Sequence, residues 1–271
     1  MVILHKGVLS TNMKARIIGS GKETIILAHG YGGDQSVWDK ILPKLMSNYQ
    51  ILLFDWSFSG AVKDQCLFDS EKYSSYEAFA DDLIALLDDM KLDSSIFVGH
   101  SMSGIIGCIA SVKRPNLFNR LILVASSPRF INLEDYVGGF EIADIEQMFQ
   151  NIEENYGVWS SGFARIAVDP SDPPSVEKFE KSLKRMGVEV ALPLAKTVFL
   201  SDYRAILEKV VTPCTIIQCK IDFAVPNSVA TFMHTNIKGE STVEIINTRG
   251  HFPQLTAHEE FLNVIHRVLT S

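Results

Sequence analysis

The sequence lacks the features that mark several large classes of protein. No apolar run approaches the ~18 residues of a membrane-spanning helix, so no membrane segment is expected. Acidic residues outnumber basic ones, 32 against 25, for a net charge of −7, and no block of basic residues occurs. A surface that follows nucleic-acid phosphates is therefore not expected. Residues 1–7 lack the long apolar core of a signal peptide, from which we expect a cytoplasmic protein.

Cysteine is scarce, and motifs that bind metals or nucleotides are missing. The four cysteines, Cys66, Cys108, Cys214 and Cys219, include no pair at Cys-x-x-Cys spacing. We interpret them as reduced thiols, two of them at the ends of a buried strand, in preference to disulfides or a metal site. No zinc-protease motif, no Walker phosphate loop and no dinucleotide fingerprint is present. Neither a metal nor a nucleotide cofactor is therefore expected.

Short apolar runs alternate with amphipathic segments along most of the chain. The 271 residues, 46% apolar and 21% charged, match one large globular domain or a domain with an insertion. Apolar residues recur at helical spacing over residues 81–90 and 103–114. Six runs rich in Ile, Leu and Val resemble strands buried on both faces of a parallel sheet: residues 24–28, 51–55, 95–99, 121–125, 215–219 and 242–246. This order predicts a doubly wound α/β sheet.

The alternation breaks after residue 125, and the next expected strand begins only at residue 215. The stretch between them carries four helical patterns, over residues 141–154, 158–167, 175–186 and 189–200. It is rich in large aromatic side chains, which either all pack helix against helix or partly face a cavity above the sheet. Because an insertion has little volume for a core of its own, we expect some of them to face a cavity.

The strongest local signal is the run Gly99-His100-Ser101-Met102-Ser103, between an expected strand and an expected helix. A strand–turn–helix of this kind can present a serine hydroxyl above the carboxyl edge of a sheet, and it requires small residues on either side of the serine. Gly99 meets that requirement. Ser103 stands where the pattern has Gly, and it is small enough to fit. Ser101 is therefore the candidate nucleophile.

A serine hydroxyl is a weak nucleophile unless a base takes its proton and an acid orients that base. In this type of fold the partners follow in the order Asp or Glu, then His. Asp222 comes three residues after the expected strand 215–219, and His251 follows the expected strand 242–246. These positions predict a Ser101–His251–Asp222 triad. His100 neighbours the nucleophile but does not hold the place of a base.

An acyl-transfer site also needs donors for the oxyanion that forms during the reaction. The first candidate is the backbone N–H of Met102, directly after the nucleophile. The second lies in the glycine-rich loop 29–33 after an early strand, where we favour the backbone N–H of Tyr31. The alternative interpretation of that loop is a plain tight turn.

Several segments together resemble the RsbQ-like α/β-hydrolases, a group that includes the plant strigolactone and karrikin receptors. The similarity runs over nearly the whole chain, and DWSFSGAVKDQ (55–65) most resembles the DWARF14-LIKE2 branch. The other segments that carry the resemblance are HGYGGDQSVW (29–38), ILLFDW (51–56), VGHSMSGIIGCIAS (98–111), RPNLF (114–118), SSPRFIN and EDYVGGFE (126–132 and 134–141), and GHFPQL (250–255).

The resemblance implies an α/β-hydrolase fold, with a core over residues 1–126 and 201–271 and a four-helix lid over residues 127–200. It implies a monomer without a cofactor, whose triad attacks the butenolide ring or the enol-ether ester of strigolactone-like molecules. Partners implied by the resemblance are a small apolar butenolide-type ligand and an F-box or other signalling protein, in the cytoplasm and also the nucleus. By motif position, the expected pocket residues are Tyr31, His100, Phe130, Phe140, Trp159, Phe163, Val198, Phe199 and Phe223.

The chain departs from the receptors in three places. Tyr31 stands where they usually have Phe, and Phe223 is larger than the aliphatic residue expected there. Both changes predict a narrower or more polar pocket. Residues 184–188 lack the receptors' basic-plus-Pro pattern, which disfavours receptor-type docking. We therefore expect a slow esterase or lactonase. The alternatives are a ligand-sensing receptor whose lid recruits a partner, and a broad carboxylesterase, which would want a wider pocket.

Overall fold

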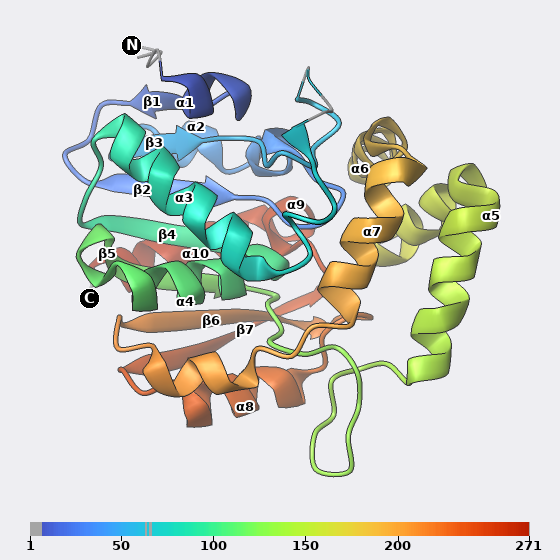
Figure 1. Ribbon diagram of the computed structural model, residues 1–271. Coiled ribbons are helices and arrows are strands. Elements are labelled where there is room, and N and C mark those ends of the chain that lie inside the picture. Colours follow the sequence, from blue (N-terminus) through green and yellow to red (C-terminus); the bar gives the residue numbers. More distant parts are fainter. Residues whose placement is uncertain (1–6, 63, 65–66, 271) are drawn as a thin grey trace.

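A seven-stranded sheet forms the centre of the protein, for which a computed structural model describes residues 7–62, 64 and 67–270. The strand order is β1-β3-β2-β4-β5-β6-β7, and within it β1 pairs with β3 in antiparallel fashion while the other pairs are parallel. The strands are β1 (Arg16–Gly19), β2 (Thr24–Ala28), β3 (Gln50–Leu53), β4 (Ser95–His100), β5 (Phe118–Val124), β6 (Cys214–Ile221) and β7 (Ser241–Arg249). This is the mostly parallel sheet that the alternation of apolar runs and helical segments predicts (Figure 1).

All six expected strands form, and their burial follows their place in the sheet. Every residue of β4, at the centre, is buried, as the continuous apolar run predicts. The expectation of burial on both faces is wrong for β7, whose residues are mostly half-buried or exposed. The reason is that β7 lies at the edge of the sheet and pairs only with β6. The other edge strand, β1, is four residues long and was not expected from the sequence.

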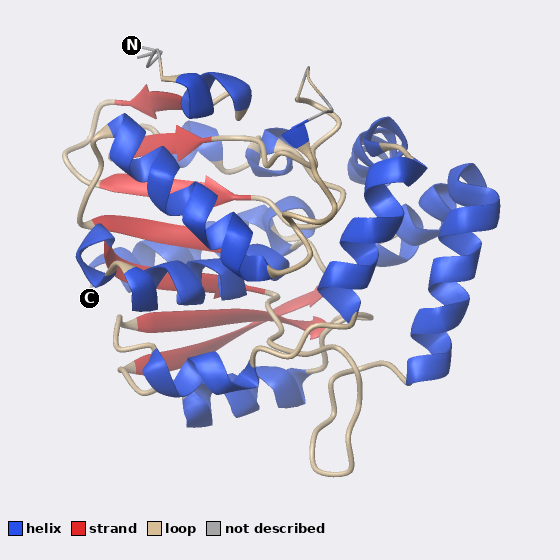
Figure 2. Cartoon of the chain, in the orientation of Figure 1, coloured by secondary structure: helices blue, strands red, loops and turns tan. Residues whose placement is uncertain are grey.

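Helices cover both faces of the sheet, as Figure 2 shows in blue around the red strands. In Figure 1, α3, α4 and α8 lie in front of the sheet, and α2, α9 and α10 lie behind it. The helices of the core are α1 (Val8–Asn12), α2 (Leu42–Leu45), α3 (Tyr76–Met90), α4 (Met102–Lys113), α8 (Asn227–Asn236), α9 (Pro253–Thr256) and α10 (His258–Thr270). These two layers bury the sheet and leave the carboxyl ends of its parallel strands facing the third group of helices.

That third group stands beyond the carboxyl ends of the strands and is formed by the segment between β5 and β6 (Figure 1). It consists of α5 (Ile142–Ala167), α6 (Pro173–Met186) and α7 (Val188–Phe199). Inside α5, Asn155 has non-helical angles (φ −143°, ψ 48°), so the helix is kinked between the two helices that the sequence predicts there. The side chain of Asp172 accepts the Ser175 N–H at 3.3 Å to begin α6, and Gly187 (φ 78°) ends it.

Three cysteines fall in the described residues, and all three are free and buried. Burial raises the pKa of the thiols of Cys108, Cys214 and Cys219, which keeps them protonated and unreactive. Cys66 lies outside the described residues. Within the described ranges, no helix combines the length and the apolar character needed to cross a membrane.

Candidate active site

Ser101 occupies a strained turn between β4 and α4. Its backbone has φ 57° and ψ −125°, a conformation that residues with side chains rarely adopt. The turn is tight, because a Cβ on Gly99 would stand 2.6 Å from a ring carbon of Phe97 and 2.7 Å from the backbone nitrogen of Gly104. A small residue is therefore required two positions before Ser101, as the sequence pattern predicts.

Ser103, which replaces the usual glycine of this turn, uses its hydroxyl to join two loops. Its Oγ donates to the carbonyl oxygen of His29 at 2.6 Å and accepts from the indole Nε1 of Trp56 at 2.9 Å. The same indole N–H also donates to the carbonyl of His29, at 3.0 Å. The serine thus ties the start of α4 to the loop that begins at His29. Glycine at this position would lack the hydroxyl that makes these bonds.

The structure brings Ser101, His251 and Asp222 together in one chain of hydrogen bonds. Nε2 of His251 lies 2.9 Å from Oγ of Ser101, and Nδ1 of His251 lies 2.8 Å from Oδ2 of Asp222. A carboxylate at Nδ1 holds the proton on that nitrogen and leaves Nε2 free to accept from the serine. This tautomer is assigned from the hydrogen-bond partners.

The Asp222 carboxylate is fully buried and is fixed by its surroundings. Its Oδ1 accepts the backbone N–H groups of Ala224 at 2.9 Å and Val225 at 3.3 Å, and its Oδ2 also accepts from Nε2 of Gln218 at 3.2 Å. Three hydrogen bonds of this kind hold the carboxylate in one orientation. The orientation of His251 therefore depends on the backbone of the loop after β6.

Two neighbouring strands position Asp222 and His251. Ile221, near the end of β6, pairs with Arg249 at the end of β7, and the next residues of both strands lead directly to Asp222 and His251. The backbone N–H of His251 donates to the carbonyl of Ala167 at 2.6 Å, which anchors the histidine loop to the end of α5. The position of the base is thus shared between the sheet and the helical segment.

The backbone N–H groups of Tyr31 and Met102, beside Ser101, have no acceptor in the described part of the chain. Met102 is the first residue of α4, where the helix leaves its N–H groups unpaired. The loop of Tyr31 lies against the nucleophile turn, since a Cβ on Gly30 would stand 2.9 Å from the Cβ of Ser101. Both amides therefore remain available to a negatively charged oxygen above Ser101.

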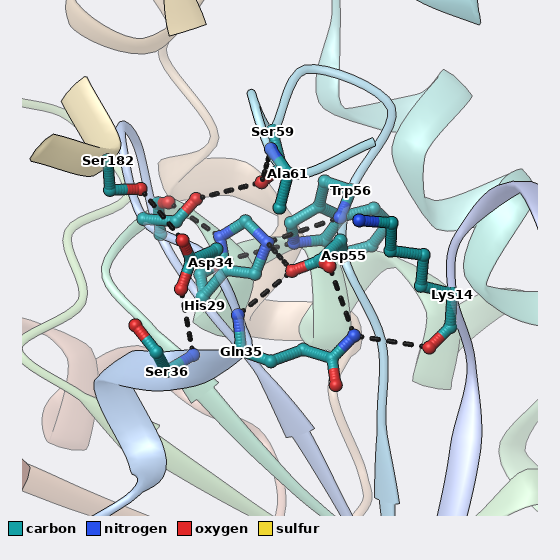
Figure 3. A network of polar contacts seen from close by, with 12 residues as sticks. Lys14, His29, Asp34, Gln35, Ser36, Asp55, Trp56, Ser59, Ala61 and Ser182 are labelled. Carbon is teal, nitrogen blue, oxygen red and sulfur yellow. Dashed lines mark hydrogen bonds and ion pairs between the residues drawn. The ribbon is translucent and has the colours of Figure 1, made fainter. Parts of the chain in front are cut away.

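A buried polar network holds the loop that carries Tyr31 (Figure 3). Nδ1 of His29 lies 3.0 Å from the carbonyl of Gly30, and its Nε2 accepts the backbone N–H of Trp56 at 3.2 Å. The Asp55 carboxylate accepts both the backbone N–H and the side-chain amide of Gln35, at 2.9 and 3.1 Å. The ring of His29 therefore satisfies one backbone group in its own loop and one in the loop after β3.

The same loop is tied to α6 through Asp34. Its Oδ2 accepts from the hydroxyl of Ser182 at 3.2 Å and from the guanidinium of Arg185, and its Oδ1 accepts the backbone N–H of Ser36 at 2.8 Å. Burial by itself would raise the pKa of Asp34, but the hydrogen bonds from Ser36 and the positive charge of Arg185 lower it below the ordinary value. An ionised Asp34 therefore fixes the helical segment to the loop of Tyr31.

Two buried histidines near the site stay neutral. Burial lowers the pKa of His29, and burial together with the neighbouring His251 holds the pKa of His100 well below the ordinary value of 6.5. Nε2 of His100 donates to the carbonyl of His251 at 2.8 Å, while its Nδ1 has no partner among the described residues. His100 thus supports the loop of the base, as a neutral ring.

The cavity above Ser101 is small, about 20 Å³. A volume of that size holds about one water molecule, whereas ligand pockets usually measure ~300–1,000 Å³. The cavity as it stands is therefore too small to hold an ester substrate. The cavity is lined by Tyr31, His100, Ser101, Phe130, Phe163, Ala167, Phe179, Val198, Phe199, Phe223, Ala224, His251 and Phe252.

Two of the nine expected pocket residues do not line this cavity. Phe140 lies behind it and contacts the rings of Phe199 and Phe223, with centroids 5.8 and 6.4 Å apart. Trp159 stacks on Phe163 at 4.8 Å and faces a groove outside. The sequence reasoning missed Ala167, Phe179, Ala224 and Phe252. Two of these could have been found from the sequence, because Ala224 and Phe252 lie within two residues of Asp222 and His251.

The hydroxyl of Tyr31 does not point at a free space in the cavity. It is buried and donates to the carbonyl of Ala191, in α7, at 2.9 Å. Burial raises the pKa of this phenol well above its ordinary value, so it remains a neutral donor. The added hydroxyl therefore ties α7 to the loop of Tyr31. Among the residues described, no three His, Cys, Asp or Glu side chains are grouped so that they could hold a metal ion.

A serine, a histidine and an aspartate bonded in series above the carboxyl edge of a mostly parallel sheet define the class of α/β serine hydrolases. Comparison with known sequences agrees with this class. Residues 25–264 match the sequence model of the alpha/beta hydrolase family, and the chain belongs to that family.

Particular relatives are similar over nearly the whole chain. A karrikin insensitive 2 receptor of Petunia hybrida is 44% identical, covering 93% of this chain and 92% of its own. A strigolactone esterase of Arabidopsis thaliana is 41% identical, covering 95% and 96%. Among solved structures, a hydrolase from Oleispira antarctica superposes with a TM-score of 0.90 at 31% identity, covering 96% of both chains. Homologues named as esterases and hydrolases, together with the fold, support ester-hydrolysing activity.

Proposed function

We propose that this protein hydrolyses small apolar esters or lactones of the strigolactone-like butenolide class, with Ser101 as nucleophile. The observation that carries the proposal is the continuous chain of hydrogen bonds from Ser101 through His251 to the buried Asp222. The names of the relatives, which include strigolactone esterases, support the choice of substrate class.

In the first half of the reaction, Nε2 of His251 takes the proton of the Ser101 hydroxyl as Oγ forms a bond to the carbonyl carbon of the substrate. The carbonyl oxygen becomes negatively charged and is stabilised by the N–H groups of Tyr31 and Met102. The bond to the leaving oxygen then breaks, and the protonated His251 gives its proton to that oxygen. Asp222 stays ionised and stabilises the imidazolium.

In the second half, a water molecule gives a proton to His251 and its oxygen attacks the acyl carbon bound to Ser101. The bond between Oγ and the acyl carbon breaks, and His251 returns the proton to the serine. The small cavity and its aromatic walls exclude other water, which strengthens the electrostatic interactions inside. We assign residues 127–200, with α5, α6 and α7, as a lid over this site, in contact with the substrate through Phe130, Phe163, Val198 and Phe199.

The test is a comparison of wild type with Ser101→Ala. Purified protein is incubated with each enantiomer of a synthetic strigolactone and with para-nitrophenyl acetate, and product release is followed. Because removal of the nucleophile leaves only binding effects, we expect a loss of at least ~10⁴-fold in kcat for all substrates. A matched control is Ser111→Ala, which changes a buried serine of α4 whose hydroxyl bonds the carbonyl of Cys108.

The two sets of substrates separate the outcomes. Turnover of para-nitrophenyl acetate alone would support the triad and contradict the butenolide class. Turnover by Ser101→Ala at the wild-type rate would contradict the proposed nucleophile.

A second role, ligand sensing, is supported by the relatives named as karrikin insensitive receptors. In this proposal a bound ligand changes the arrangement of α5–α7, and a signalling protein recognises the new surface. Binding of a candidate partner to Ser101→Ala in the presence of ligand would show that sensing needs no hydrolysis. Partner binding that is unaffected by ligand in both proteins would contradict the sensing role.

A further inference from the structure

Three hollows meet around the carboxyl end of α5. The first is the cavity of about 20 Å³ above Ser101. The second, which we call the α5 groove, measures about 610 Å³ and is lined by Asn151, Asn155, Val158, Trp159, Gly162, Phe163 and Ile166. The third, which we call the β6 hollow, measures about 310 Å³ and is lined by Ile166, Pro170, Ile221, Asp222, Phe223, Arg249 and Gly250.

Two side chains belong to the inner cavity and to an outer hollow at once. Phe163 lines both the cavity and the α5 groove, and Phe223 lines both the cavity and the β6 hollow. Their rings meet edge to face, with centroids 5.6 Å apart and planes at 83°. Ile166 lines both outer hollows and so joins them outside the two rings. The wall between Ser101 and the outside is therefore one pair of rings thick at this point.

The rest of the cavity wall has no such outer face. Phe163 and Phe223 are half-buried, whereas every other side chain that lines the cavity is buried. Tyr31 is bonded to α7, and Phe179 packs against Phe252 with centroids 4.5 Å apart. Because the cavity is too small for any ester, a substrate requires the wall to open, and the ring pair is its thinnest part.

We propose that Phe163 and Phe223 form a gate through which an apolar, ring-bearing ester reaches Ser101, and that Phe223 sets the size of the compound that passes. This inference rests on the proposed hydrolase function and names the path and the limit on its substrates. The reacting acyl group occupies the cavity, while the alcohol part lies outward between the rings and in the α5 groove.

The backbone around the gate suits movement of the rings. Asp222 is held by the amides of Ala224 and Val225, so the Phe223 ring can turn by side-chain rotation without disturbing the acid. Phe163 follows the kink of α5, in a half-helix that contains Gly157 and Gly162. A Cβ on either glycine would meet nothing within 4 Å, so close packing does not require them. Glycine inside a helix costs up to ~1 kcal/mol relative to alanine, so the two glycines lower the intrinsic stability of this half of α5.

The lining of the outer hollows indicates the chemistry of the compound. The α5 groove presents Val158, Trp159 and Ile166, and the β6 hollow adds Ile221, of which Val158, Ile166 and Ile221 are exposed. The indole of Trp159 stacks on Phe163 with planes at 21°, so it continues the aromatic surface of the gate outward. An alcohol part with a flat apolar ring would cover this surface, whereas a charged one would lose hydration there.

The first test compares two acetate esters, naphthyl acetate and para-nitrophenyl acetate, in wild type and Phe223→Leu. Both give the same acetyl-enzyme, so the ratio of their kcat/KM values reports passage and acylation and not deacylation. We expect the ratio to shift in favour of naphthyl acetate by about 10-fold in Phe223→Leu, because the smaller side chain widens the gate. Phe232→Leu is the matched control, since Phe232 lies in α8, contacts Tyr136 and lines none of the three hollows, and its ratio should not change.

The second test needs no catalysis. Ser101→Ala is labelled with fluorotryptophan, and the fluorine resonance of Trp159, assigned with Trp159→Phe, is followed as naphthyl acetate is added. We expect this resonance to shift as the ester binds. When the Phe223→Leu substitution is introduced as well, we expect exchange between the free and bound states to be faster. If wild type hydrolyses neither ester but the resonance responds in this way, the gate stands and the proposed function fails. Hydrolysis with an unchanged ratio in Phe223→Leu and an unmoved Trp159 resonance would overturn the gate and leave the function intact.

Discussion

The two walls of the catalytic cavity are held by different forces. The wall formed by the sheet loops is polar, and nearly every group in it has a hydrogen-bond partner, from Asp222 and His251 to the Ser103 hydroxyl. The wall formed by α5–α7 is aromatic, and rings such as Phe163 and Phe199 meet their neighbours by edge or tilted contacts. Hydrogen bonds have strict geometry, whereas ring contacts tolerate rotation.

The difference explains how one site can combine exact chemistry with changeable access. Reacting groups must be held to within about half an ångström, and the hydrogen bonds of the polar wall, which we call the bonded wall, restrain Asp222 and His251 in position. The aromatic wall only has to exclude water and admit one class of compound. Even the glycines differ: Gly99 is required because a side chain would collide, whereas Gly157 stands in open space.

Asp222→Asn breaks the bonded wall and should have the largest effect. An amide at this position no longer holds the proton on Nδ1 of His251, so we expect kcat for para-nitrophenyl acetate to fall by about 10⁴-fold. The control is Asp88→Asn, which removes a surface ion pair with Arg114. Circular dichroism checks that both variants fold. Activity within tenfold of wild type would show that His251 is oriented by something other than Asp222.

Ser103→Ala tests whether the same wall depends on a single buried hydroxyl. Its loss leaves the Trp56 indole and the His29 carbonyl with one partner fewer, so we expect the free energy of unfolding to fall by ~1–3 kcal/mol. Urea denaturation of Ser103→Ala and Ser111→Ala measures the difference. The Ser111 hydroxyl bonds only within its own helix, so the cost there should be smaller. Equal costs would contradict the linking role of Ser103.

A change of pH should weaken the bonded wall before the aromatic one. His29 and His100 have a pKa below 6.5 in the folded protein, so the unfolded chain takes up protons first as the pH falls. The contribution of the two neutral histidines to the free energy of unfolding is fully present above pH 6.5. It is lost as the pH falls below 6.5, by up to ~1.4 kcal/mol per pH unit for each histidine. Asp55, whose pKa is raised above 3.8 by burial, acts in the opposite direction at lower pH.

Urea denaturation between pH 7 and about pH 5 measures this slope. In His100→Asn one of the two groups is gone, and the slope should fall to about half. A wild-type stability that is flat over this range would mean that neither histidine is kept neutral by the fold.

Gly157→Ala tests the aromatic wall, and its expected effect is the smallest. Since nothing lies within 4 Å of the added methyl group, we expect a gain of ~0.5–1 kcal/mol in the free energy of unfolding. Gly99→Ala, where the methyl group would collide with Phe97, should instead destabilise. Thermal unfolding of both variants gives the comparison, and a loss of stability in Gly157→Ala would show that this glycine is needed by the fold.

The candidate triad was accessible from the sequence because each member follows a strand. Parallel strands end at one edge of the sheet, so residues just after β4, β6 and β7 had to be neighbours, however far apart they lie in the chain. The network of His29, Gln35 and Asp55 was not accessible in the same way. Its bonds depend on how three loops fold around one another, and no periodicity records that.

In the helical segment, the sequence pattern predicts the helices but not the positions of individual side chains. Its helices were predicted in place, and the break in α5 falls at Asn155, between the two predicted halves. Trp159 and Phe140 were nevertheless expected in the cavity and lie outside it. The position of Trp159 depends on the rotation of the second half of α5 after the kink, and that of Phe140 depends on the loop that precedes α5. No spacing of apolar residues determines either of these or the rotamers of the rings. For the same reason the closed state of the cavity could not be foreseen.

The strand order has a consequence for the biosynthesis of the protein. Ser101 follows β4, but the histidine that would activate it comes 150 residues later, after β7 has been added to the edge of the sheet. During translation the serine therefore leaves the ribosome long before its base does. A nascent chain in this state carries Ser101 without its histidine partner, and the chain of hydrogen bonds from Ser101 to Asp222 is completed only when β7 docks on β6.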